Sequence, residues 1–407
     1  MLDVNAVRSD FPIFSRRVNG AKLVYLDSAA TMQLPEPVLR ALEEQYHRYQ
    51  ANVHRGIHTL SEESTARLEA ARGRVRALLG ARENAEIIFT SGTTQSINTA
   101  ALALEFSGQI TAGDAVVTTE MEHHSNLLPW QQLCARTGAE LRVIPVNAAG
   151  ELDLAAAERA LCGAKLLAVT MVSNVTGCVN DAAKLTALAH AAGAQVLLDA
   201  AQAMRCGPID VQALDCDYLC FSGHKLLAPT GTGVLYGKAE LLRALPPVFT
   251  GGGMVRHASA AGAEWEDIPY RFEAGTANIA GCIALGAALE YLASRGPAAV
   301  AAREQALLDQ TEAILAARSF VTVYGAPARR HGAISFNLRG LGCFDTAKLL
   351  DAQGVAVRSG HLCAQPYVNA LGAEGVVRVS PAFYNTEDEL AAFAAALDRI
   401  ASRLGLE

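Results

Sequence analysis

Short apolar runs and longer amphipathic segments alternate along the middle of the chain, from residue 86 to residue 236. The apolar runs predict buried strands at 86–90, 115–119, about 140–145, 165–172, 195–199, 218–221 and 233–236. Helical spacing between most of these runs predicts helices at 95–104, from about 127, between 145 and 165, and at 181–192. Such alternation indicates an α/β fold, with a mostly parallel sheet covered by helices on both faces.

The two ends of the chain follow other patterns. Before the α/β region we expect a short helix and connector at 1–20, a strand at 23–27, and helices at 35–49 and 64–79. After it, a Gly-rich, polar stretch at 250–275 predicts a mobile or packing loop, followed by a long helical region from about 281 to 318. The remainder predicts an α+β unit with strands at 320–324, 332–338 and 355–358 and helices at 344–353 and 386–404.

These patterns divide the chain into domains. We expect a large domain at 21–280, then a connector helix and a smaller C-terminal domain at 281–407, on which residues 1–20 pack. A length of 407 residues with 51% hydrophobic residues is ample for a large core and for two or more domains.

Charge and hydropathy exclude several classes of protein. The net charge of −7 argues against a nucleic-acid or anionic-membrane surface. No apolar run reaches the roughly 18 residues of a membrane span. The first residues, MLDVNAVRSDF, carry acids where a signal peptide has an apolar core.

The nine cysteines support neither a disulfide framework nor a zinc site, because their number is odd and no pair has Cys-x-x-Cys spacing. With no secretion signal, free thiols in a reducing cytoplasm are the expectation. No metal site is predicted, and most of these cysteines are expected to behave as small core residues.

The stretch that organises the chemistry is DYLCFSGHKLLAPTGTGVLYG, which places Lys225 between two apolar runs. Burial there disfavours the charged ammonium, lowers its pKa and makes the amine a nucleophile able to form a Schiff base. A solvent-exposed lysine in a loop is the alternative for a lysine considered alone.

Two neighbouring features favour the chemical interpretation. Asp199 ends the predicted strand 195–199, at the edge where α/β sheets bind ligands. Ser222 and His224, next to Lys225, offer groups that could hold an oxyanion. A carboxylate, an anion site and an amine are what pyridoxal 5'-phosphate (PLP) requires: the lysine holds the aldehyde, and the acid keeps the pyridine nitrogen protonated.

LLDAAQA followed by FSGHKLLAPTGTGVLYG resembles the class V, fold-type I PLP-dependent aminotransferases. Within that family the chain resembles the group II cysteine desulfurases, the SufS/CsdA branch that is similar to selenocysteine lyases, from about residue 8 to the C-terminus. The resemblance implies a fold-type I PLP-dependent transferase, and it implies a homodimer.

The segment TSGTTQ at 90–95 joins a predicted strand to a predicted helix, which makes an anion site from backbone amides and hydroxyls. Considered alone, Gly-Thr-Thr is a helix cap. By resemblance Thr93 and Thr94 cradle the PLP phosphate. Gln95 stands where the family has Glu and is expected to support the turn. Thr276, in RFEAGT, resembles the residue that completes the phosphate site of the partner subunit.

A histidine pair follows the strand at 115–119, but adjacent residues rarely share one metal and no other ligands have suitable spacing. By resemblance His123 stacks on the pyridine ring and could move protons, whereas His124 is structural. Asn174 lies just past a strand end; it resembles the residue that orients substrate carboxylate and cofactor oxygen, although a turn asparagine is the alternative.

The loop RSGHLCAQP carries the reaction type. Cys363 lies among Gly, His, Gln and Pro, close to Arg358 and His361, in an electropositive setting that favours the thiolate. The loop resembles the RxGxxCAxP loop of group II desulfurases, which makes Cys363 the catalytic cysteine; a buried, inert thiol is the alternative.

Arg378 lies inside the apolar run VVRVS and needs an anion partner. That partner is either a structural carboxylate or, by resemblance, the substrate carboxylate in a bidentate clamp. The resemblance therefore gives three sets of residues: catalytic Lys225, Cys363 and His123; cofactor-binding Thr93, Thr94, His123, Asp199, Gln202, Ser222, His224, Lys225 and Thr276; and substrate-binding Asn174, Arg358 and Arg378.

The resemblance implies a cytoplasmic cysteine desulfurase of iron–sulfur cluster assembly, with selenocysteine lyase activity as well. L-cysteine would yield L-alanine and a persulfide on Cys363, from which a SufE-like acceptor protein takes the sulfur. Two alternatives remain: a class V β-lyase of the kynureninase type, which would not need Cys363, and a non-catalytic sulfur-assembly scaffold. His54 and Arg55, in NVHRGIHTLS, receive no role.

Overall fold

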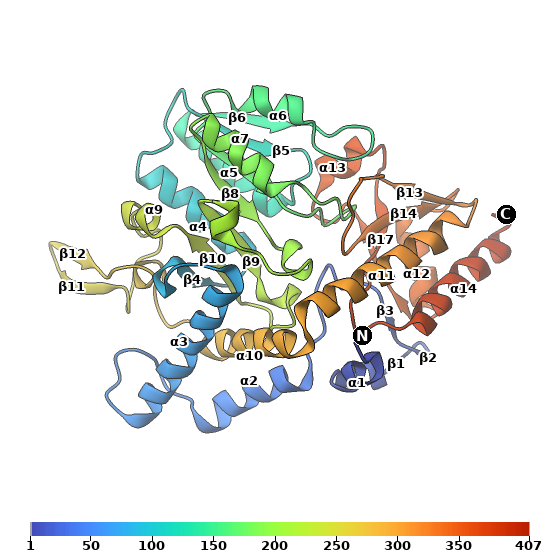
Figure 1. Cartoon of the computed structure of the whole chain (residues 1–407), viewed down its shortest axis with the longest axis horizontal. Helices are drawn as coiled ribbons and strands as arrows, with labels where there is room; N and C mark the ends of the chain where they lie inside the picture. The colour runs from blue at the N-terminus through green and yellow to red at the C-terminus, as the bar shows by residue number, and fades with distance from the viewer. Residues whose placement is uncertain (1, 407) are drawn as a thin grey trace.

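The computed structural model describes residues 2–406, and a seven-stranded sheet forms its centre (Figure 1). In spatial order its strands are β4 (Ile87–Thr90), β10 (Gly233–Gly237), β9 (Tyr218–Ser222), β8 (Gln195–Asp199), β7 (Leu166–Thr170), β5 (Ala115–Thr119) and β6 (Glu140–Ile144). Neighbours from β9 to β6 are parallel, and β10 is antiparallel to both β9 and β4. The predicted α/β class and mostly parallel sheet are confirmed.

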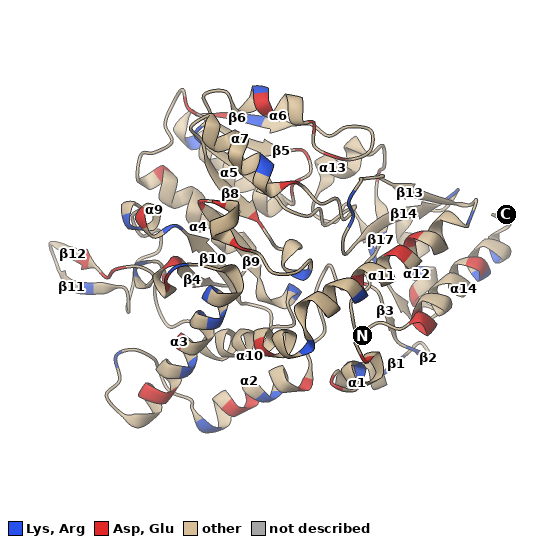
Figure 2. Cartoon of the chain, viewed as in Figure 1, with Lys and Arg blue, Asp and Glu red and all other residues tan. Residues whose placement is uncertain are grey.

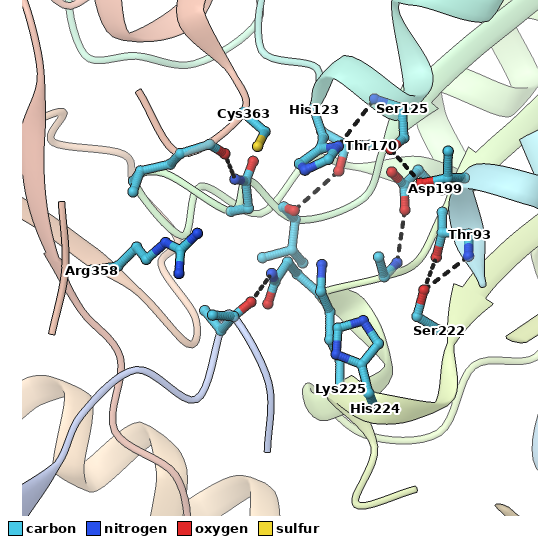
Figure 3. Close-up of a pocket in the computed structure, with 18 of the residues that line it drawn as sticks. Thr93, His123, Ser125, Thr170, Asp199, Ser222, His224, Lys225, Arg358 and Cys363 are labelled. Atoms are coloured by element: carbon cyan, nitrogen blue, oxygen red, sulfur yellow. Dashed lines mark hydrogen bonds between the residues drawn. The ribbon is translucent and has the colours of Figure 1, made fainter. Parts of the chain in front are cut away.

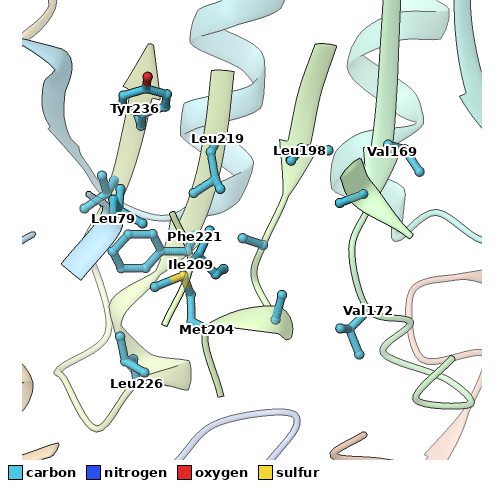
Figure 4. Packing of buried hydrophobic residues seen from close by; sticks show 14 of the residues in the cluster. Leu79, Val169, Val172, Leu198, Met204, Ile209, Leu219, Phe221, Leu226 and Tyr236 are labelled. Atoms are coloured by element: carbon cyan, nitrogen blue, oxygen red, sulfur yellow. The ribbon is translucent and has the colours of Figure 1, made fainter. Parts of the chain in front are cut away.

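Both faces of this sheet are buried, which explains why its strands are apolar runs rather than alternating patterns. Successive side chains point to opposite faces. Leu198, Leu219 and Phe221 join one hydrophobic cluster, and Leu197 and Cys220 join the other. Figure 4 shows part of the first cluster, with side chains of the strands packed against those of neighbouring segments.

Six helices follow the predicted positions. They are α2 (Glu36–Arg48), α3 (Thr59–Leu79), α4 (Thr93–Phe106), α5 (Leu128–Thr137), α6 (Leu154–Leu161) and α7 (Ala182–Ala191). Two short helices, α8 (Val211–Leu214) and α9 (Ala239–Ala244), were not predicted. The helix predicted at 64–79 begins five residues earlier, at Thr59, because the His58 side chain caps its first turn by accepting from the Ser61 N–H.

The C-terminal unit is a second sheet with helices, as the α+β pattern predicts. Its antiparallel strands, in spatial order, are β13 (Val321–Tyr324), β14 (Ile334–Leu338), β17 (Val376–Val379) and β16 (Arg358–Gly360). Around it lie α12 (Cys343–Asp351), α13 (Gln365–Ala370) and α14 (Glu387–Leu404). The separate strand β15 (Val355–Ala356) pairs in parallel with β3 (Val24–Tyr25). A segment near the start of the chain therefore packs on the C-terminal unit.

Two expectations were wrong in detail. The helical region at 281–318 is two helices, α10 (Ile279–Arg295) and α11 (Pro297–Ala316). Gly296, at φ 76°, and Pro297 separate them, since a left-handed glycine ends a helix and proline suits the first position of the next. The loop at 250–275 contains a β-hairpin, β11 (Val255–Ser259) and β12 (Gly262–Trp265), which projects away from the C-terminal unit (Figure 1).

The N-terminal segment contacts both parts of the chain. Its helix α1 (Val4–Ser9) places Arg8 2.6 Å from Glu389 of α14. Asp10 pairs with Arg295 of α10 at 2.7 Å. The short 3₁₀ turn Pro12–Ser15 and the paired strands β1 (Arg17–Val18) and β2 (Ala21–Lys22) follow. The boundaries at residues 20 and 280 stay a prediction.

Acidic and basic residues are interleaved along helices such as α2 and α14 (Figure 2). Within residues 2–406, no helix combines the length and the apolar character needed to span a membrane.

Candidate active site

One cavity collects nearly all the residues that the sequence singled out, from both parts of the chain (Figure 3). The predicted site residues that line this cavity are Thr93, Thr94, His123, Asn174, Asp199, Gln202, Ser222, His224, Lys225, Arg358, Cys363 and Arg378. Most follow the carboxyl ends of strands in the large sheet, the edge where such sheets bind ligands. Arg358, Cys363 and Arg378 come from the C-terminal unit.

Lys225 ends a single 3₁₀ turn that directly follows β9. The turn is tight because a Cβ on Gly223 would lie 2.4 Å from the Thr232 hydroxyl, so only glycine fits. Burial lowers the pKa of Lys225 to about 8; the Asp199 carboxylate opposes this shift and the Arg378 charge adds to it. Roughly a tenth of the amine is therefore unprotonated at pH 7, far more than for an ordinary lysine with a pKa of 10.5.

Asp199 is the last residue of β8 and is buried. One carboxylate oxygen accepts a hydrogen bond from the Ala201 N–H at 2.8 Å. Burial raises the pKa of Asp199, while that bond and the Lys225 charge counteract the rise. Its position at the strand end, across from the β9 residue Cys220, brings the acid close to the Lys225 turn.

The start of α4 has the geometry expected of an anion site. Its first-turn amides lack carbonyl partners within the helix, as at any helix N-terminus. The Thr93 N–H and hydroxyl both lie 2.8 Å from the Ser222 hydroxyl, and the Thr94 hydroxyl lies 2.7 Å from that of Ser125. Gly233 permits the close packing, because a Cβ there would lie 2.3 Å from the Gly92 Cα.

His123 lies four residues after β5, at the start of a 3₁₀ turn, and its orientation is fixed. Its Nδ1 accepts from the Ser125 N–H at 3.0 Å, which leaves the proton on Nε2. Burial, followed by the Lys225 charge, lowers the pKa of His123 to about 3. The ring is therefore neutral at physiological pH and can stack on an aromatic ligand without adding charge.

Gln202 and His224 connect the cavity to the segment after β3. Gln202 donates from Nε2 to the Ala29 carbonyl at 2.8 Å. The His224 carbonyl accepts from the Met32 N–H at 2.9 Å, and burial lowers the pKa of its imidazole to about 4.

Arg378 has the structural carboxylate partner that was one of the two considered for it. Its Nη2 lies 2.9 Å from the Asp27 carboxylate, and its Nη1 donates to the Asn174 carbonyl at 2.9 Å. The same buried side chain lines the cavity. Arg358 stands opposite Arg378 on β16 and is exposed at the cavity. Two guanidinium groups on one wall favour a carboxylate ligand there.

Cys363 is exposed and lies in the short loop between β16 and α13. Leu362 and Cys363 have φ of 55° and 57°, in the left-handed region. The Asn174 amide anchors the loop by donating to the Leu362 carbonyl at 2.7 Å. Loop and sheet thus bring the thiol to the cavity that holds Lys225.

Thr276 is the one predicted site residue outside this cavity. It borders a separate hollow, together with His54, Arg55 and Tyr270. Arg55 donates to the Val255 carbonyl of the hairpin at 2.8 Å. Gln95 accepts from the Ser91 N–H at 2.6 Å and supports the turn as expected.

Sequence reasoning missed Ser125 and Thr170, which also line the cavity. Both follow the rule that identified Asp199: Thr170 ends β7, and Ser125 lies in the turn after β5. It also missed Asp27, because nothing in the sequence links Asp27 to Arg378, 351 residues away.

The comparisons with known proteins agree with this geometry. A family model described as Aminotransferase class-V matches residues 24–393. A cysteine desulfurase of Klebsiella pneumoniae (strain 342) is 48% identical over 404 residues, which cover 99% of each chain. The chain belongs to the cysteine desulfurases of the class-V aminotransferase family.

Solved structures of this family share the fold. The apo cysteine desulfurase of Thermococcus onnurineus NA1 has a TM-score of 0.93 and 38% identity, covering 99% of this chain and 98% of that one. The cysteine desulfurase CsdA (S-sulfonic acid) of Escherichia coli has a TM-score of 0.91 and 38% identity, covering 99% of both chains. The predicted family and fold-type I class are confirmed.

Class-V cysteine desulfurases depend on PLP, and the cavity fits that cofactor. It offers a buried amine of lowered pKa, a buried carboxylate with room for a further partner, and a helix N-terminus with hydroxyl groups for a phosphate. The neutral imidazole of His123 also lines the cavity. Lys225 would hold the aldehyde, Asp199 the pyridine nitrogen, and Thr93 and Thr94 the phosphate.

Proposed function

We propose that this chain is a PLP-dependent cysteine desulfurase that uses Lys225 as its base and Cys363 as its sulfur acceptor. The observation that carries the proposal is that one cavity contains a buried, partly unprotonated amine and an exposed thiol from different parts of the chain. A β-lyase would require the amine but gives no reason for the thiol.

When bound, PLP supplies an electron sink that makes the Cα proton of the amino acid acidic. Lys225 removes that proton, and its lowered pKa suits a base that works near neutral pH. Asp199 compensates positive charge on the pyridine nitrogen. His123, neutral and fixed through Nδ1, would stack on the ring and would pass a proton from Nε2.

Cys363 takes the sulfur. Its thiolate attacks the sulfur of the bound cysteine, so that a sulfur–sulfur bond forms and the bond from Cβ to sulfur breaks. The electron pair of the broken bond stays with the carbon skeleton, which gains a proton and leaves as L-alanine. Cys363 is left as a persulfide, so no external oxidant is needed for this step.

Three residues are suited to orienting the substrate. Arg378 offers a cation at the cavity wall, and Asn174 is fixed beside it because its carbonyl accepts from Arg378. Arg358 stands opposite Arg378 and is exposed, so its guanidinium is accessible to a ligand. A guanidinium fork matches a carboxylate in geometry and charge.

Several finer features belong to the same proposal. The separate location of Thr276 is what a homodimer requires if Thr276 completes the phosphate site of the partner subunit. L-selenocysteine reacts by the same route because selenium is the better leaving group. A SufE-like protein removes the persulfide sulfur for iron–sulfur cluster assembly. The nine free cysteines support a reducing cytoplasm.

The deciding experiment mixes purified holoenzyme with L-cysteine in the absence of reductant. We expect one equivalent of L-alanine and a mass gain of one sulfur in the peptide that contains Cys363. The exposed thiol of Cys162 serves as the internal control and should not gain sulfur. Other amino-acid products without sulfur on Cys363 would indicate a β-lyase, and failure to bind PLP would indicate a scaffold.

A further inference from the structure

His124 is next to His123 in the sequence but does not line the cavity. It contacts the Cys363 loop instead. Its backbone N–H donates to the Cys363 carbonyl at 2.6 Å, and its Nε2 accepts from the Gln365 N–H at 3.3 Å. The two hydrogen bonds therefore hold the loop at Cys363 itself and two residues later, at Gln365.

The loop needs such support because its backbone conformation is unfavourable. Leu362 and Cys363 are consecutive non-glycine residues whose backbone φ lies in the left-handed region, which L-residues rarely adopt. Strained backbone persists only where surrounding contacts hold it. Upstream of Cys363, the Asn174 amide holds the Leu362 carbonyl at 2.7 Å. Downstream, the His124 imidazole holds the Gln365 N–H.

The remainder of α13 is held independently of His124. The buried Tyr367 donates to the Gly150 carbonyl at 2.6 Å and lies 2.9 Å from the Thr176 hydroxyl. Loss of the imidazole would therefore leave α13 docked and release only the few residues around Cys363. The backbone bond from residue 124 to the Cys363 carbonyl would also persist in any side-chain variant.

We propose that His124 is a positioning residue, whose Nε2 fixes the start of α13 and thereby holds the Cys363 sulfur at the substrate. Its side chain acts through the Gln365 N–H and does not line the cavity. Its proton lies on Nδ1, because Nε2 is the acceptor. This inference rests on the proposed function, in which Cys363 is the sulfur acceptor.

Two variants whose side chains differ by one methylene group distinguish the effect of a correctly placed hydrogen-bond acceptor from the effect of a polar side chain at residue 124. In His124→Gln the side-chain oxygen reaches about as far as Nε2 and can accept from Gln365. In His124→Asn the amide ends near the position of Nδ1 and falls short. Both are prepared as holoenzymes and mixed with L-cysteine in a single turnover. Persulfide on Cys363 is quantified by mass spectrometry. The visible absorbance of the cofactor reports the steps in which Lys225 takes part, namely substrate binding and removal of the Cα proton.

We expect His124→Asn to form the persulfide roughly tenfold to 100-fold more slowly, because misplacing a reacting atom by ~1 Å has an effect of that order. The absorbance change on substrate binding should stay at the wild-type rate. His124→Gln should retain most of the wild-type rate. A second measurement needs no turnover: hydrogen exchange in the peptide that contains Gln365 should lose protection in His124→Asn but not in His124→Gln.

Wild-type rate together with wild-type protection in His124→Asn would overturn the inference, as would equal impairment of both variants. Failure of the proposed function looks different, since the wild-type holoenzyme itself would then form no persulfide. In that case hydrogen exchange alone still decides whether Nε2 holds the loop.

Discussion

Lys225 and Cys363 reach the same cavity by opposite structural means. Lys225 follows a strand that is buried on both faces, and the surrounding protein lowers its pKa to about 8. Cys363 is exposed in a loop with left-handed backbone, anchored by hydrogen bonds from Asn174 and His124. The large sheet tunes the chemistry of the amine, whereas the loop determines where the thiol lies.

The difference matches the roles proposed for the two groups. A base must keep one environment through the whole reaction, and a rigid sheet provides it. A sulfur acceptor must first meet the substrate and afterwards present its sulfur to another molecule. An exposed loop with few anchors allows both, because loops held by few contacts open at low free energy.

The largest effect is expected at the amine. Lys225→Ala removes both the attachment point and the base, so the Schiff-base absorbance should disappear and turnover should fall by about 10,000-fold or more. Visible absorbance and alanine release measure the two losses. Lys184→Ala, at an exposed lysine of α7, is the control and should change neither. Retained absorbance in Lys225→Ala would contradict the assignment.

A variant that lacks the thiol should separate the contribution of Cys363 from that of Lys225. Cys363→Ala is expected to keep the Schiff-base absorbance, because no bond to the cofactor is lost, and to lower cysteine desulfuration on the order of 1,000-fold, as loss of a nucleophile does. Selenocysteine should be affected less, since selenium leaves more easily. Cys162→Ala provides the matched control. Full activity of Cys363→Ala on cysteine would disprove the persulfide route.

The same contrast explains what could be predicted from the sequence. Residues at strand ends, such as Asp199 and Lys225, follow from local apolar patterns, because burial and the sheet edge are encoded nearby. The tether between His124 and Gln365 could not be predicted, since it joins residues 241 positions apart through a backbone amide. The hairpin at 255–265 was missed because its side chains are mostly exposed and show no clear alternation.

A smaller effect is expected at the acid. Asp199→Asn keeps the shape of the side chain and the acceptor for the Ala201 N–H but removes the charge that would stabilise a protonated pyridine. Turnover should fall roughly 100-fold, which is typical for loss of one electrostatic partner in an active site. Persulfide on Cys363 should still form, only more slowly. An unchanged rate would show that the pyridine nitrogen has no need of Asp199.

The smallest effect is a shift on the pH axis, and it tests burial as the cause of the amine's reactivity. In apoprotein, the rate at which Lys225 captures PLP should rise with pH as the ammonium loses its proton, and should level off above about pH 8 rather than continue toward the ordinary lysine pKa of 10.5. Asp199 raises the Lys225 pKa, so Asp199→Asn should move the midpoint to lower pH. Stopped-flow absorbance from about pH 6.5 to 10.5 measures both midpoints. A rate that keeps rising beyond pH 10 in both proteins would mean that water reaches the amine freely, and the contrast between a tuned amine and a merely positioned thiol would then be lost.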